Sequence, residues 1–131
     1  MSRFRPTTPW VALAWIGILA LPVGAQSNYT AQVEFQFRIV RTFAESVGFD
    51  QVHKPIFSSL RDDQEKTTPL ALRAGHECRI MALCDADCSD LDIVVTDPSG
   101  TEVGSDTGLN DAPIVGFRVE EDGEYTVRVR M

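Results

Sequence analysis

The second half of the chain is a series of short apolar–polar alternations, each ended by Gly, Pro or Asp. Successive side chains of a β-strand point to opposite faces, so a period of two predicts strands with one buried face. The turn signal is strongest at Asp97-Pro98-Ser99-Gly100. The predicted strands cover residues 56–60, 67–72, 76–84, 91–96, 101–105, 113–119 and 124–130. Seven short strands at close spacing are typical of an antiparallel β-sandwich or barrel.

The alternation also assigns an inward face to each strand. Leu91, Ile93 and Val95 should point into the core, as should Tyr125, Val127 and Val129 of the last strand. Pro69 has no N–H to donate to a ladder, so the strand over 67–72 is expected at a sheet edge. A chain of 131 residues is long enough for one such domain.

A different period precedes the strands. Apolar residues over 28–47 recur at spacings of three and four, which predicts an amphipathic helix. Asn28 is suited to cap its start, and Gly48 to end it with a positive φ. The main apolar stripe consists of Val33, Phe37, Val40, Ala44 and Val47.

Phe35, Ile39 and Phe43 widen this apolar surface beyond an ordinary stripe. Either the helix packs across the β domain, or it offers apolar surface to a partner. A connector over 48–55 links it to the strands.

The first 25 residues have the three parts of a secretory signal. Arg3 and Arg5 give a positive start, Trp10–Leu21 is apolar, and small residues precede a cleavage site between Ala25 and Gln26. The alternative is an uncleaved membrane anchor, but the apolar run is short for a span of about 20 residues. We therefore expect a signal peptide (1–25), a helix with its connector (26–55) and a β domain (56–131), in a secreted or periplasmic protein without a stable membrane anchor.

The acidic balance excludes one class of partner. The net charge is −7, and removal of the leader takes away two arginines and no acid. Nucleic-acid binding requires clustered Lys and Arg to neutralise phosphates, and the chain has no such cluster.

The predicted compartment bears on the redox state of the cysteines. Cys84 and Cys88 lie four residues apart in a loop, and export to an oxidising compartment favours a disulfide between them. Half of a zinc site is the alternative, but no second Cys or His pair accompanies it. Cys78 is in phase with the inward residues of its strand and is expected as a buried free thiol. A nucleophile paired with His76 is the competing interpretation.

Aspartates cluster around this loop. Four fall within eight residues, and two more lie on a later loop that can approach them in a sandwich. Calcium takes six to eight oxygen ligands, so the cluster is a candidate calcium site, although its spacing is not that of an EF-hand. The alternative is that these residues are turn formers on a solvated surface. The candidate ligands are Asp85, Asp87, Asp90, Asp92, Asp106 and Asp111.

No catalytic residues are predicted. No nucleophile motif surrounds any Ser, and nothing singles out a carboxylate pair for acid–base chemistry. The outward Arg79, Arg128 and Arg130 form either a patch for an acidic ligand on one sheet face or cross-strand ion pairs.

Taken in order, these residues resemble the bacterial pre-peptidase C-terminal domain family, over 56–131. The matching pieces are Leu72-x-x-Gly75, Ile80, Ala82, Cys84-Asp85-Ala86-Asp87-Cys88, Asp90-Leu91-Asp92-Ile93, Asp97-Pro98-x-Gly100, Pro113-Ile114-Val115 and Gly123-Glu124-Tyr125-Thr126-Val127. The chain departs from the family at Cys78, where an aromatic residue is usual, and in its helix.

The resemblance implies a mainly β, jelly-roll-like sandwich with a non-catalytic role in solubility, secretion or holding a matrix or protein surface. Some members bind calcium. We therefore expect a secreted or periplasmic binding or accessory module, calcium-stabilised, for a protein or a cell-surface glycan. The alternatives are a small acidic inhibitor or immunity-type protein that acts on an exported enzyme, and an enzyme.

Overall fold

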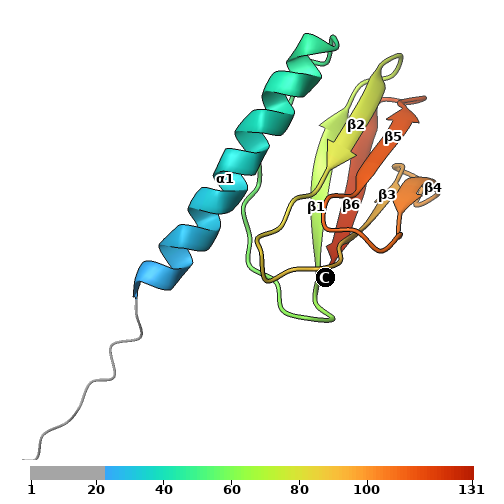
Figure 1. The fold of residues 1–131 in the computed structure, drawn as a ribbon. Coiled ribbons are helices and arrows are strands. Elements are labelled where there is room, and N and C mark those ends of the chain that lie inside the picture. Colours follow the sequence, from blue (N-terminus) through green and yellow to red (C-terminus); the bar gives the residue numbers. More distant parts are fainter. Residues whose placement is uncertain (1–22) are drawn as a thin grey trace, which may run out of the picture.

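The computed structural model describes residues 23–131, with side chains from Asn28 onward. The predicted leader therefore lies outside the described residues, except for 23–25. A long helix, α1 (Val23–Ser46), stands beside a β domain of six strands (Figure 1). The strands are β1 (Glu65–Leu72), β2 (Glu77–Met81), β3 (Asp92–Thr96), β4 (Glu102–Asp106), β5 (Ile114–Arg118) and β6 (Gly123–Arg130). The mainly β class with one helix is confirmed.

The strands form two antiparallel sheets. One has the order β1-β6-β3-β4, and the other pairs β2 with β5. Both sheets contribute to one core, in which Ile93 and Val95 of the larger sheet pack with Val115 and Phe117 of β5. The Val115 side chain of β5 packs directly on the β4 backbone at Gly104, where an added Cβ would lie 2.5 Å from Cγ1 of Val115.

The predicted inward faces are confirmed. Leu91, Ile93 and Val95 are at most 4% exposed. Tyr125 is also buried, stacks on Phe117 with 5.8 Å between ring centroids, and donates its hydroxyl to the carbonyl oxygen of Glu121. The polar end of this ring is therefore satisfied inside the core.

The predicted strand over 56–60 is wrong. This segment has no ladder, although it runs beside the open side of β1 (Figure 1) and Lys66 Nζ donates to Ser58 Oγ. Pro69 offers no N–H, and the Ala71 carbonyl, which points the same way, already contacts the His53 ring at 3.2 Å. The edge position predicted from Pro69 is confirmed, and the same residue helps to keep a seventh strand from pairing.

The helix differs from the prediction at its start and agrees at its end. It begins at Val23, so Asn28 lies inside it and is not a cap. Ala25 and Gln26 are good helix formers, and Asn costs less than about 1 kcal/mol in a helix interior. Gly48 has φ of +93°, and the Phe49 N–H donates to the carbonyl of Ala44, which is a Schellman ending.

We predict that Ile93→Ala destabilises the protein by about 2–5 kcal/mol, because Ile93 is fully buried where the sheets meet. Ile114→Ala is the matched control, since Ile114 is 45% exposed and should change stability by about 0.5 kcal/mol or less. Urea unfolding midpoints measure both. Equal effects of the two substitutions would contradict the assignment of the core.

Candidate functional site

Helix α1 carries two apolar stripes that point in different directions. Val33, Phe37 and Val40 are half-buried, so their side of the helix meets the rest of the protein. Phe35, Ile39 and Phe43 follow one another at a spacing of four and share another side. Their exposures are 59%, 56% and 67%. We call these three residues the outward stripe.

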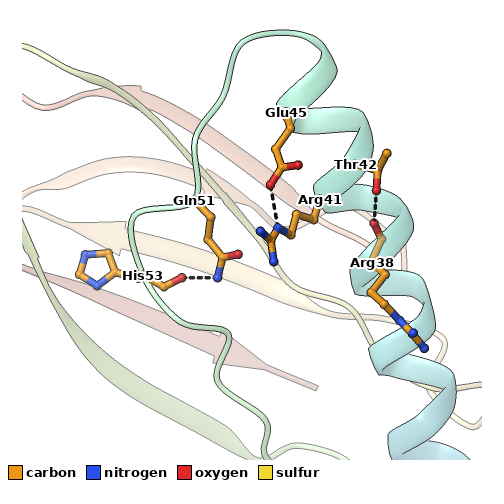
Figure 2. Close-up of polar contacts among 6 residues, drawn as sticks. All are labelled: Arg38, Arg41, Thr42, Glu45, Gln51 and His53. Carbon is orange, nitrogen blue, oxygen red and sulfur yellow. Dashed lines mark hydrogen bonds and ion pairs between the residues drawn. The ribbon is translucent and has the colours of Figure 1, made fainter.

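The polar side chains around the outward stripe are engaged within the helix itself. Thr42 donates to the Arg38 carbonyl, and Arg41 pairs with Glu45 at 2.7 Å (Figure 2). A shallow surface hollow lies here, lined by Arg38, Ile39, Thr42, Phe43 and Ser46. The described helix carries Glu34 and Glu45 against Arg38 and Arg41, so its charges balance. An apolar protein segment suits such a surface better than an ionic ligand does.

The connector after α1 extends the exposed apolar surface. Val52, Ile56 and Phe57 are 76%, 56% and 46% exposed. Gln51 Nε2 donates to the carbonyl of His53 (Figure 2), and the His53 ring contacts the Ala71 carbonyl at the β1 edge. One side of the helix is therefore half-buried and another is exposed, and binding of a partner by the exposed side stays a prediction.

Cys84 and Cys88 form the predicted disulfide. We call residues 84–88 the disulfide ring. The ring contacts α1, because Ala86 N–H donates to Gln32 Oε1 at 3.2 Å, and the Tyr29 hydroxyl faces the Asp87 carboxylate. This contact and the charge of Asp87 raise the pKa of Tyr29 above its ordinary value. The sequence gives no sign of this contact, because it depends on where the helix lies.

Two of the candidate calcium ligands converge on Asn110, which the sequence analysis missed. Asp90 Oδ1 accepts from the Asn110 backbone N–H, and Asp106 Oδ1 accepts from its side-chain amide. Asp106 also accepts from the backbone N–H groups of Ile114 and Gly108. These hydrogen bonds, that of Ile114 first, lower the pKa of Asp106 below its ordinary value.

The other four aspartates have separate roles. Asp85 accepts from the N–H of Asp87 within the disulfide ring, and Asp87 faces Tyr29. Asp92 lies in β3 opposite Arg130, and Asp111 is exposed on a loop. Over residues 23–131, no group of three or more His, Cys, Asp or Glu is arranged to hold a metal ion. The calcium site stays a prediction.

Cys78 and the three arginines have ordinary structural surroundings. Cys78 is a free, half-buried thiol packed against the core, and burial raises its pKa, which disfavours a reactive thiolate.

Arg79 lies on β2 and stacks on Phe49, whereas Arg128 and Arg130 belong to β6 in the other sheet. The prediction that all three share a sheet face is therefore wrong. Arg130 pairs with Asp63 at 3.1 Å and Arg128 with Glu65 at 4.0 Å, which confirms ion pairing for these two.

Comparison with protein-family models and with curated proteins found no match. Within the described part of the chain, α1 is too polar to cross a membrane and no other helix occurs.

We predict that Asp106→Ala weakens the pH dependence of stability at acid pH. The pKa of the Asp106 carboxyl is lower in the folded chain than in the unfolded chain, so the unfolded chain binds more protons at acid pH. The stabilisation that Asp106 contributes is therefore present above the ordinary pKa near 4, and it is lost as pH falls through the folded pKa. Urea midpoints from pH 7 to pH 2 measure it. Asp111→Ala is the control, because the Asp111 side chain has no such partners, and equal effects would contradict the assignment.

The predicted calcium site is tested by the thermal midpoint in millimolar calcium and in excess chelator. A site would raise the midpoint with calcium, and an unchanged midpoint would contradict it. In that case the backbone N–H groups that engage Asp85, Asp90 and Asp106 suffice for these carboxylates. A bound ion at 100 times its Kd would stabilise the fold by about 2.7 kcal/mol. A midpoint raised by calcium, and no longer raised in Asp90→Ala, would establish the site predicted from the sequence.

Proposed function

We propose that this chain is an exported, non-catalytic binding or accessory module that binds a protein partner through the outward stripe of α1. The observation that carries the proposal is the arrangement of α1, which turns Phe35, Ile39 and Phe43 away from its half-buried side. A helix that served only to cover the β domain would not need a second apolar stripe.

The energetics suit a reversible contact. Full burial of a Phe or Ile side chain contributes about 1.5–3 kcal/mol, and each residue of the stripe is already partly buried. The stripe therefore supplies several kcal/mol, from which the loss of rotational and translational freedom on binding is subtracted. The partner is expected to present an apolar groove or helix, because the described helix offers balanced charges and few free donors.

The finer fold assignment belongs to the same proposal. We propose that the two sheets form a jelly-roll-like sandwich of the pre-peptidase C-terminal type. Two features support this assignment: the core shared by the two sheets and the turn at Asp97. In this turn, one carboxylate oxygen of Asp97 accepts from the N–H groups of Ser99 and Thr101. Export of the chain rests on its N-terminal sequence pattern.

The second candidate is a small acidic inhibitor or immunity-type protein that blocks an exported enzyme. The net charge of −7 favours it, since an acidic surface speeds association with a basic target. Both candidates use the outward stripe, and they differ in whether the partner loses activity when bound.

The test places a photo-crosslinking residue at position 39 and, as a control, at position 109, where Leu109 is 92% exposed on the loop between β4 and β5. We expect one protein to crosslink from position 39 in periplasmic extract and none from position 109. Ile39→Ser with Phe43→Ser should weaken its binding roughly tenfold or more, and Leu109→Ser should leave it unchanged.

A crosslinked enzyme that loses activity at a one-to-one ratio would favour the inhibitor. Retention on cell-wall glycan that is unaffected by the Ile39 and Phe43 substitutions would contradict the proposed surface.

A further inference from the structure

The N-terminal half of α1 is tied to the β domain at the disulfide ring. Gln32 Oε1 accepts a hydrogen bond from the Ala86 backbone N–H at 3.2 Å, and Tyr29, one helical turn earlier, faces the Asp87 carboxylate. The two contacts need residues 86 and 87 to be presented side by side in one fixed turn. That turn is closed by the Cys84–Cys88 bond.

The ring is itself fixed to the β domain. Cys88 is buried, and Cys84 Sγ lies 3.5 Å from the carbonyl oxygen of Asp111. On either side of the ring, Ala82 N–H donates to the Pro113 carbonyl and Leu91 N–H to the Asn110 carbonyl. The ring therefore forms a short bridge between the loop before β5 and the helix.

The opposite end of α1 is held without the ring. Phe49, which follows the Schellman ending, has the Arg79 guanidinium 5.0 Å from its ring centroid. Loss of the ring contacts would thus free the N-terminal half of the helix while its C-terminal end stays attached. The strand core contains no residue of α1, so it does not depend on the helix being in place.

We propose that the Cys84–Cys88 disulfide is a redox clamp, and that its reduction by a dithiol releases the N-terminal half of α1 while the β domain stays folded. This inference concerns the helix and holds whatever partner the outward stripe binds.

The chemistry is thiol–disulfide exchange. A thiolate of the dithiol attacks a ring sulfur, and Cys84, which is less buried than Cys88, is the accessible one. The S–S bond breaks as a mixed disulfide forms, and Cys88 leaves as a thiolate that takes up a proton. The second thiol of the reductant then displaces Cys84, so two cysteine thiols form and the reductant becomes a disulfide.

Release has a structural consequence, because the freed segment is half of the 24-residue helix, and an isolated helix of only about 12 residues is marginally stable in water. Once Tyr29 and Gln32 lose their partners, the first turns of α1 should fray.

The experiment uses the exported chain with Cys78→Ser, so that no third thiol can exchange, and dithiothreitol as the reductant. Hydrogen exchange is followed with and without reductant. We expect amide exchange over residues 29–34 to accelerate roughly tenfold or more. Amides of β3, β5 and β6 should keep their protection.

A second variant separates the clamp from general destabilisation. Tyr29→Phe with Gln32→Ala keeps the disulfide and should reproduce the faster exchange of α1 without reductant. Glu34→Ala, an exposed change on the same helix, is the matched control and should not. Further reduction of the double variant should add little.

Unchanged exchange in α1 after complete reduction would overturn the clamp. Loss of protection in β3 and β5 together with α1 would overturn it as well, because the disulfide would then hold the whole domain. The absorbance titration of Tyr29 is an independent readout, since its raised pKa should fall toward the ordinary value of tyrosine on reduction.

Discussion

The packing of β5 against β3 and β6 is the interaction on which the rest of the molecule depends. Ile93 and Val95 from one sheet meet Val115 and Phe117 from the other, and Gly104 leaves room for the Val115 side chain. This core fixes the strand ends, and the strand ends fix the loops that carry Asn110 and the disulfide ring. The position of the helix is set in turn by those loops.

Much of the β domain was predictable because burial in a strand leaves a local pattern. The alternation around Ile93 and the turn at Asp97 depend on neighbours in the chain, and both were assigned correctly. The segment over 56–60 has a similar composition, but pairing at an edge is decided by the partner strand, and the blocked side of β1 is invisible in the local sequence. The early start of α1 reflects propensity that outweighs the capping signal of Asn28.

The candidate site was predictable only in its parts. The disulfide and the unusual apolar content of the helix followed from spacing and compartment. The contacts of Tyr29 and Gln32 with the ring did not, because they join residues more than 50 positions apart. The aspartates were likewise predictable as a cluster but not in their contacts. Their chemistry suggested a shared ion, whereas the fold engages Asp90 and Asp106 with Asn110 and its neighbours.

The blocked side of β1 has a consequence for the protein at high concentration. A free strand edge offers a template on which copies of a chain stack into fibres. Pro69 removes one donor from that row, and His53 occupies the Ala71 carbonyl. Self-association by sheet extension is thus discouraged at the β1 edge of the larger sheet.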